Sequence, residues 1–326
     1  MVSTATDWLT RLPAPAGALE PIQRRGREAL AQLGLPTRRQ EDWRLTDLTR
    51  LQGLLTLPLA ALDHASAEAA SAQNVPGRPE NGWRVVLDGH SDPLAGVTLP
   101  EGVSELSGSE LEQALGHTLA RCGSAHHWPV EFNHSLASQV LALRIRGSVP
   151  PLEVLVGAAE ASLSPTRILL VVEEKAELEI LEVFLADSGA AHSHLFEMHL
   201  GQEARVRHGV VAQGSGDSAL MAHLAVEQEP RSSYELITVS RGWALGRLEP
   251  QVVQVDGQAS TVLKGLVLTA DEQQFATHTT MRFEGEEGEL DQLQKTVAAG
   301  RSHSIFNGAV NVPRAAQRTN AAQLSR

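Results

Sequence analysis

The chain has 326 residues, a net charge of −12 and 42% hydrophobic residues, and these values exclude several classes of protein. A general nucleic-acid binder carries a basic face, which an acidic chain of this kind does not supply. The single cysteine, Cys122, excludes an internal disulfide framework and a metal or cluster site made only of cysteines. No apolar run approaches the ~20 residues of a membrane span, and residues 1–17 lack the apolar core of a signal peptide. We therefore expect a cytoplasmic protein without a nucleic-acid or membrane partner.

Residues 1–75 are predicted to form an N-terminal helical segment. Apolar residues among charged ones predict a helix from Leu19 to Leu33, which Gly34 ends. Over residues 38–57 apolar side chains recur at spacings of three and four, which indicates an amphipathic helix or helix pair with Trp43 as a core anchor. The alanine-rich residues 60–72 could continue the helical segment.

Residues 76–138 are predicted to form a small mixed α/β linker region. It contains a short strand at Val85–Leu87 and a capping box at 109–112, which would open a helix reaching Arg121. Three histidines, His126, His127 and His134, follow in an expected loop. Their irregular spacing favours an ordinary loop over a metal site.

From residue 139 to 326 the hydrophobic period changes to two, which predicts a β core. A dozen strand candidates begin every 10 to 16 residues and are separated by Gly, Asp, Ser and Pro. Since few helical segments intervene, alternating βα units are excluded, and a sandwich, barrel or solenoid remains. The connections rarely have the Asn-Gly or Asp-Gly form of tight hairpins, and this favours the solenoid.

The last stretch, residues 301–326, has the pattern of a half-buried strand followed by a second extended run. Phe306, Gly308 and Val310 alternate with polar or small residues, and Pro313 interrupts the strand ladder. We expect Phe306 to lie in the core, so that Phe306→Ala would cost roughly 3–5 kcal/mol.

Two histidine motifs could bind a metal. His192 and His194, followed by Glu197 and His199, are similar to the ligand pattern of cupin-type enzymes. In a regular strand, however, His192 and His194 share one face while Glu197 and His199 point the other way, so a three-ligand site would need a bulge. A cupin-type metal-dependent enzyme using His192 and His194 is therefore the alternative function.

The second motif is Thr277-His278-Thr279. The apolar residues of this strand mark the face of Thr277 and Thr279 as inward, so His278 is expected on an outer or interface surface, as a candidate metal ligand. The sequence has none of the motifs of a nucleotide triphosphatase, a GxSxG hydrolase or an HExxH protease, and no catalytic residue is assigned.

Several motifs, in order along the chain, resemble the SufB/SufD family of the Suf iron–sulfur cluster assembly system. They are EDWRLTDL at 41–48, RVVLDG at 84–89, LTADEQQFATHTTMRF at 268–283 and RSHSIFNGAVNVPRAAQRTNAAQ at 301–323. The gap pattern and the lack of cysteines are more similar to SufD than to SufB.

The resemblance implies a mainly β fold, with a right-handed parallel β-helix (solenoid) core preceded by an N-terminal helical segment. It also implies a non-catalytic scaffold subunit of a SufBCD complex that supports cluster assembly and iron entry. The partners would be a SufB-like paralogue and a SufC-like ATPase, and a homodimer is also open. No cofactor would be bound stably, and iron or an Fe–S cluster would be held in passing at the complex interface.

The chain departs from the family pattern at two places. A second histidine of the family's HT block falls at about Phe283, and family members continue past the block that ends near Gln323. Their later Cys/His motif and the helices that contact SufC would lie beyond Arg326. The resemblance therefore implies that the chain is a fragment, and that none of its residues inherits those roles.

Overall fold

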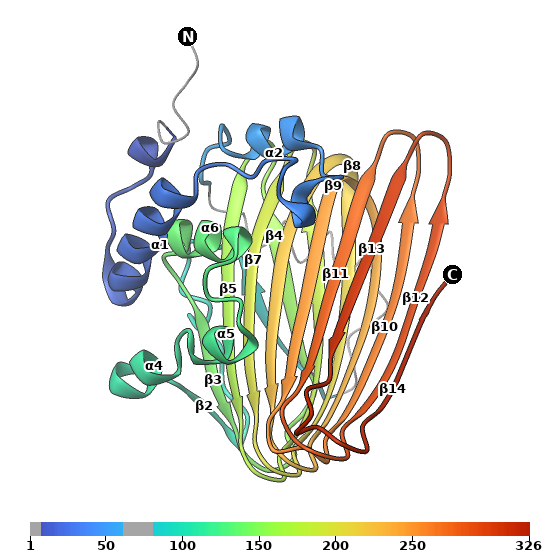
Figure 1. Ribbon diagram of the computed structural model, residues 1–326. Helices are drawn as coiled ribbons and strands as arrows, with labels where there is room; N and C mark the ends of the chain where they lie inside the picture. The colour runs from blue at the N-terminus through green and yellow to red at the C-terminus, as the bar shows by residue number, and fades with distance from the viewer. Residues whose placement is uncertain (1–7, 61–80) are drawn as a thin grey trace.

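The computed structural model describes residues 8–60 and 81–326. Helices cluster near the N-terminus and strands form a long β structure behind them (Figure 1). The helices are α1 (Glu20–Leu33), α2 (Leu48–Leu54), α4 (Gly108–Ala114), α5 (His117–Cys122) and α6 (Trp128–Leu136), with 3-10 turns η1 (Leu9–Arg11), η2 (Gly17–Leu19) and η3 (Glu41–Trp43). Within the described ranges no helix has the length and apolar character needed to cross a membrane.

The described strands form one 14-stranded sheet in which every pairing is parallel except that of β2 with β3. The strands are β1 (Trp83–Leu87), β2 (Val103–Glu105), β3 (Leu141–Ile145), β4 (Leu152–Ala158), β5 (Leu163–Val172), β6 (Glu177–Ala186), β7 (Ala191–Leu200), β8 (Arg205–Gln228), β9 (Ser233–Gln254), β10 (Ser260–Thr269), β11 (Gln274–Phe283), β12 (Glu289–Ala298), β13 (His303–Asn311) and β14 (Asn320–Ser325). The sheet winds into a solenoid of about seven turns, which confirms the predicted fold class.

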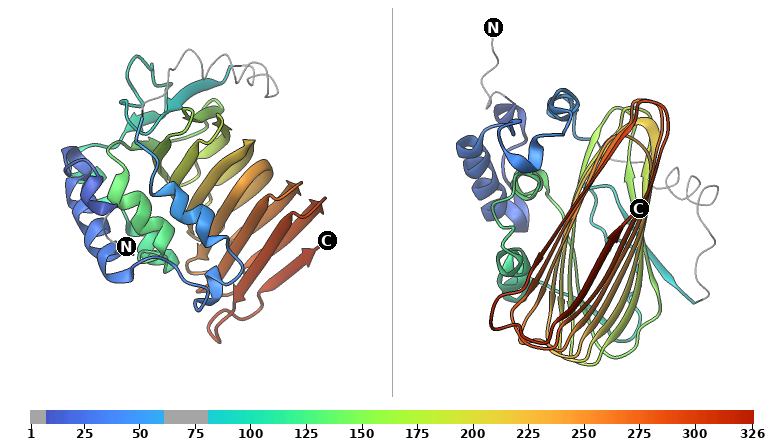
Figure 2. Two further views of the ribbon diagram at one scale, coloured as in Figure 1. Left: turned by 90° about the horizontal axis from the view of Figure 1, so that it is seen from above. Right: turned by 45° about the vertical axis from the view of Figure 1, so that its right-hand side comes forward.

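Each turn of the solenoid contributes one strand segment to each of two faces. One face contains β3, β5, β7, β11 and β13, and the other contains β1, β4, β6, β10, β12 and β14. The long strands β8 and β9 pass around a corner and serve both faces, with the ladder of β8 and β9 shifted between Gln213 and Ser218. Figure 2 shows the strands stacked one behind another along the solenoid axis.

One column of stacked side chains shows the repeat directly. Parallel register places these residues above one another: Leu143, Leu170, Met198, Val226, Val252, Met281 and Val310. The interval between neighbours is 26 to 29 residues. Because only the polarity pattern recurs and not the residues themselves, this repeat is not visible by inspection of the sequence.

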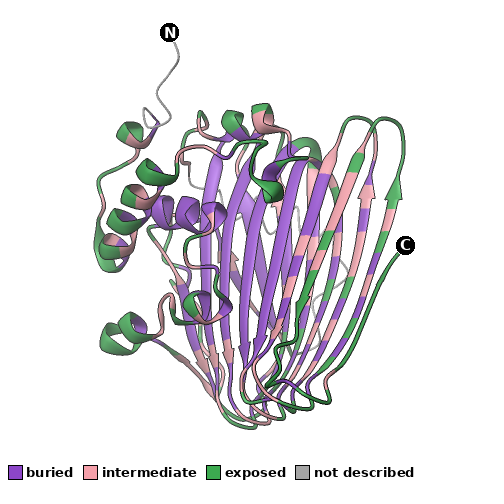
Figure 3. Cartoon of the chain, in the orientation of Figure 1, coloured by how far each residue is buried: buried purple, intermediate pink, exposed green. Residues whose placement is uncertain are grey.

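The solenoid interior is closed through its middle turns and opens at its last described turn. The column is at most 2% exposed from Leu143 to Met281, whereas Val310 is 37% exposed. Figure 3 shows the same change from buried to exposed strands toward β13 and β14. Phe306 is half-buried rather than fully buried, because no described turn stacks on β13. The expectation that Phe306 is a core residue is therefore wrong.

The helices cover the outer side of the face that contains β7, and α6 is their centre. It contacts β5, β7 and β8, while α1 packs against it from outside. The two helices approach closely at Gly26, where a Cβ atom would lie 2.7 Å from the amide nitrogen of Ser135. The helix predicted from Leu19 to Leu33 is confirmed to within one residue.

The structure corrects other local predictions. Residues 128–136 form α6, where a loop was expected. The helix predicted from the capping box is two helices, with Ser107 at the N-cap of α4 and the left-handed Gly116 separating α4 from α5. Over 38–57 only η3 and α2 are helical. Most of the alanine-rich stretch and of the linker after it lies outside the described residues.

Candidate functional site

A pocket of about 220 Å³ lies between the N-terminal helical segment and the outer face of the solenoid; we call it the helix–sheet pocket. Four short segments line it: 40–43 at η3, 126–129 at the start of α6, part of β9 from 247 to 251, and 278–280 of β11. Leu33, Asn307 and Ala309 complete its wall. The pocket therefore unites the EDW motif, two of the loop histidines and His278.

Trp43 anchors the N-terminal segment at this pocket, as predicted. Its side chain is 6% exposed and packs edge-on against Trp128, with ring centroids 5.7 Å apart. The Arg247 guanidinium lies 4.1 Å from the centroid of the Trp43 ring, a cation–π contact. Trp43 thus fixes η3 to both α6 and β9.

Arg247 is buried beneath the pocket and donates hydrogen bonds to three neighbouring residues. It donates to the Glu249 carboxylate, to the Asp42 carbonyl oxygen at 2.8 Å and to His278 Nε2 at 3.2 Å. Because arginine only donates, His278 Nε2 must be the acceptor. Burial, together with the positive charge of Arg247, lowers the pKa of His278 to about 4. His278 is therefore neutral near pH 7.

His278 lies on the outer face, as its strand position indicates. Its neighbours Thr277 and Thr279 are buried, whereas His278 is only half-buried and lines the helix–sheet pocket. Its role as a metal ligand stays a prediction. Since Arg247 occupies Nε2, only Nδ1 of His278 is open to a ligand role in this arrangement.

His223 and Glu249 lie next to each other at the floor of this region, on β8 and β9. Parallel pairing places them on adjacent rungs, with His223 Nδ1 2.9 Å from Glu249 Oε2. Burial alone would raise the pKa of Glu249, but Arg247 and His223 outweigh it and hold the pKa far below its ordinary value. Glu249 is therefore a carboxylate, and His223 Nδ1–H donates to it.

His127 reaches the same place from the helical side. It occupies the N-cap of α6 with an extended backbone, and Pro129 in the first turn suits the start of a helix. Its ring lies edge-on to that of His223, with centroids 5.7 Å apart. Burial lowers the pKa of His127, so its imidazole is neutral at pH 7.

His126 lines the same pocket as His127, but neither His126 nor His134 shares the contact of His127 with His223. His134 is buried in α6, with Nδ1 3.1 Å from a carboxylate oxygen of Glu131 and 2.8 Å from the guanidinium of Arg25. His126 is 86% exposed and lies 3.5 Å from the other oxygen of Glu131. His126 and His134 thus flank one carboxylate, while His127 faces His223.

The cupin-like motif is divided between the two sides of β7. His192 and His194 point into the solenoid interior, where both rings contact Phe184. Glu197 lies on the outer side, buried in an ion pair with Arg167. The predicted separation of the two histidines from Glu197 is confirmed, and these side chains do not form one site.

His194 belongs instead to a buried polar chain inside the solenoid that sequence reasoning missed. Glu182 Oε1 accepts from His208 Nε2 at 2.8 Å, and its other oxygen lies 2.9 Å from His194 Nε2. Thr166 and Tyr234 contact the remaining nitrogens of the two rings at 2.8 and 3.0 Å. Burial opposes ionisation of Glu182, but the two histidines outweigh it and lower its pKa to about 2.

Cys122 is the one cysteine of the chain. It is buried at the end of α5, and its Sγ lies 3.4 Å from the Val226 carbonyl oxygen. Burial raises the pKa of the thiol to about 12. Cys122 does not belong to the group of His127, His223 and Glu249.

The chain is a parallel β-solenoid with a helical cover on one outer face, which defines its structural class. The family model described as "SUF system FeS cluster assembly, SufBD core domain" matches residues 155–326. The chain therefore belongs to the SufBD family, and it is a protein of iron–sulfur cluster assembly. Members of this family are generally non-catalytic assembly proteins.

Three curated relatives agree with this assignment. The chain is 29% identical to the iron-sulfur cluster assembly SufBD family protein slr0076 of Synechocystis sp., over 92% of this chain and 70% of the relative. It is 25% identical to protein ABCI7, chloroplastic, of Arabidopsis thaliana, over 100% and 72% of the two chains. It is 24% identical to the iron-sulfur cluster assembly protein SufD of Escherichia coli, over 90% and 70%.

Proposed function

We propose that the chain is a scaffold subunit of a SufBCD-type complex and pairs edge to edge with a SufB-like paralogue. Membership of the SufBD family supports the choice of complex. The observation that carries the proposal is the match of the SufBD core-domain model over the solenoid, residues 155–326. Within the described residues, β13 pairs only with β11 and β14 pairs only with β12, and we propose that the partner adds at this edge.

The last described turn presents both backbone and side-chain groups along β13. His303 donates its amide to the carbonyl of Gln273, just before β11, so alternate amides along β13, including that of Val310, point away from β11. Val297, Val310, Val312 and Leu324 are the exposed large hydrophobic residues of this region. An unpaired parallel edge with apolar neighbours suits strand addition by a similar solenoid.

The remaining parts of the proposal concern iron, the ATPase and location. Iron or an Fe–S cluster would pass through the interface with the paralogue and would not be held there as a resident cofactor. A SufC-like ATPase would be the third component, and a homodimer through the same edge would be the competing assembly. A cytoplasmic location accords with a chain that has one buried free cysteine.

The test is co-expression of a tagged chain with SufB-like and SufC-like partners, followed by purification on the tag. We expect the SufB-like partner to co-purify with the wild-type chain. Val310→Pro removes one open-edge amide donor and should reduce recovery of the partner at least several-fold. Val310→Thr keeps both the amide and the β-branched shape, so it is the matched control. Recovery of neither partner with the wild type, or equal recovery with Val310→Pro and Val310→Thr, would contradict the edge-pairing proposal.

A further inference from the structure

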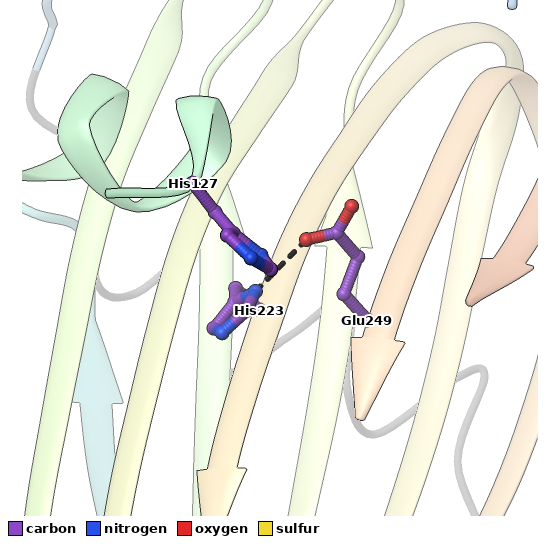
Figure 4. A group of neighbouring side chains, drawn as sticks. All are labelled: His127, His223 and Glu249. Atoms are coloured by element: carbon purple, nitrogen blue, oxygen red, sulfur yellow. Dashed lines mark hydrogen bonds and ion pairs between the residues drawn. The ribbon is translucent and has the colours of Figure 1, made fainter. Parts of the chain in front are cut away.

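Three donor groups of the types that bind transition metals meet above the outer face of the solenoid. One ligand atom from each of His127, His223 and Glu249 lies within 4.8 Å of the other two. Figure 4 shows the His127 ring directed from the start of α6 toward the contact between His223 and Glu249. Among the residues that the structure describes, no other group of three such side chains meets this criterion.

The fold, and not a local motif, brings these residues together. His223 and Glu249 are one solenoid turn apart and sit on neighbouring rungs of β8 and β9. His127 comes from the helical cover, at the N-cap of α6. A site supplied by three separate elements can form only after the cover has docked on the solenoid.

We propose that His127, His223 and Glu249 bind one divalent first-row transition-metal ion. Two imidazoles and one carboxylate are a recurring ligand set for Zn²⁺ and for Fe²⁺, with further positions left open. Both His127 and Glu249 line the helix–sheet pocket, which gives the ion a route to the site. This inference goes beyond the proposed scaffold function and does not depend on it.

The protonation states of Glu249 and His127 favour the binding of a cation. Glu249 supplies a full negative charge, and its Oε1 is held by Arg247, which leaves Oε2 directed at His223. A hydrogen bond to the outer oxygen of a ligating carboxylate is a common way to orient that ligand. His127 is neutral near pH 7, so it presents a lone pair without first losing a proton.

Two features of the structure weaken the binding of a metal ion by these three residues. A metal ion between His223 and Glu249 must break their 2.9 Å hydrogen bond. A metal at His223 Nδ1 also displaces the proton to Nε2, which is buried and has no hydrogen-bond partner in the structure. Together with the positive charge of Arg247, these costs favour an exchangeable ion over a permanently bound one.

The experiment is an anaerobic titration of the chelator-treated chain with Fe²⁺, Zn²⁺ and Co²⁺, followed by calorimetry and, for Co²⁺, by its visible absorption. We expect one equivalent to bind to the wild type. His127→Ala and Glu249→Gln should each weaken binding by at least about 10–100-fold, because loss of a group that only supports a ligand already costs that much. Both should also change the Co²⁺ spectrum.

His126→Ala is the matched control, because His126 is adjacent in sequence and lines the same pocket but lies outside the group of three ligands, with its Nδ1 3.5 Å from Glu131. It should leave affinity and spectrum unchanged. Circular dichroism of each variant checks folding, and His127→Ala, at a half-buried helix start, decides the outcome if Glu249→Gln unfolds. The proposal is overturned if the wild type binds none of the three ions stoichiometrically, if His127→Ala binds as tightly as wild type, or if His126→Ala loses as much as His127→Ala.

Discussion

At the scale of single residues, the solenoid interior contains titratable groups that the folded chain keeps in one protonation state. His192 is fully buried between Phe184 and Trp243, and its Nε2 lies 3.1 Å from the Leu185 carbonyl oxygen. Burial lowers its pKa to about 3 from an ordinary value of 6.5. Between these two pH values His192 is therefore neutral in the folded chain and protonated in the unfolded chain.

This difference predicts a loss of stability in acid. Between pH 6.5 and about 3 the unfolded state binds one more proton at His192, so the free energy of unfolding falls as pH decreases, by at most about 1.4 kcal/mol per pH unit. His192→Gln keeps a donor for Leu185 but has no titration, and it should reduce that slope. Urea unfolding at pH 7.5, 6.0 and 5.0 measures it.

The wild type, measured beside the variant, provides the reference for this slope. A slope for His192→Gln equal to that of the wild type between pH 6.5 and 5 would show that the buried histidine does not cause the loss. Loss below about pH 4.5 belongs in part to Glu182, whose pKa of about 2 is also below its ordinary value.

Sequence reasoning located some site residues but not the contacts between them. The alternation rule placed His278 on the outer face and separated His192 from Glu197, because strand side chains alternate regardless of fold. The pairing of His223 with Glu249 depends on the length of one solenoid turn. Their separation of 26 residues matches that turn, so a known repeat length would have revealed them.

At the scale of secondary-structure elements, each strand is stabilised by the turns on both sides of it. Phe275 of β11 is 1% exposed, with turns stacked on either side, whereas Phe306 of β13 is half-buried at the last described turn. Both point toward the interior in neighbouring strands. Substitutions at Phe275 and Phe306 therefore test the same side chain at two depths in the solenoid.

We expect Phe275→Ala to lower the free energy of unfolding by about 3–5 kcal/mol, the range for a buried aromatic residue. Phe306→Ala should lower it by about 1–2 kcal/mol, because roughly half as much apolar area is lost. Chemical denaturation of the two variants beside the wild type measures the difference. Equal losses would mean that β13 is as well covered in solution as β11. The sequence alone predicted a loss of roughly 3–5 kcal/mol at Phe306, whereas the structure indicates a loss of that size at Phe275.

Element predictions failed where tertiary packing decides the structure. Residues 128–136 become helix α6, although every one of them is buried, because the polar residues Glu131, His134 and Ser135 of this helix are covered by protein and not by solvent. Helix α4 has Ser107 at its N-cap, two residues before the predicted Ser109, and the left-handed Gly116 breaks the predicted helix before Arg121. The strands were predicted well because their period of two is local.

At the scale of the whole molecule, a parallel solenoid behaves as a row of turns, each supported by its neighbours. Amides in β5, β7 and β8 lie in the middle of the sheet order and within the buried part of the interior. Those of β13 and β14 lie at the end that has one neighbour each. We therefore expect amide hydrogen exchange to become faster from the middle turns toward the last described turn.

Within β13 the exchange should also alternate from residue to residue. The amide of His303 donates to the carbonyl of Gln273, just before β11, and the alternation of a parallel ladder then directs the amides of Phe306, Gly308 and Val310 away from β11. Residue-resolved exchange should find these three fast beside slower neighbours. If a SufB-like partner adds its edge strand here, the same three amides should become protected in the complex, while those of β7 stay unchanged. Uniform exchange along β13 in the free chain would contradict the predicted alternation. Protection of other amides only, in the complex, would mean that the SufB-like partner binds another surface.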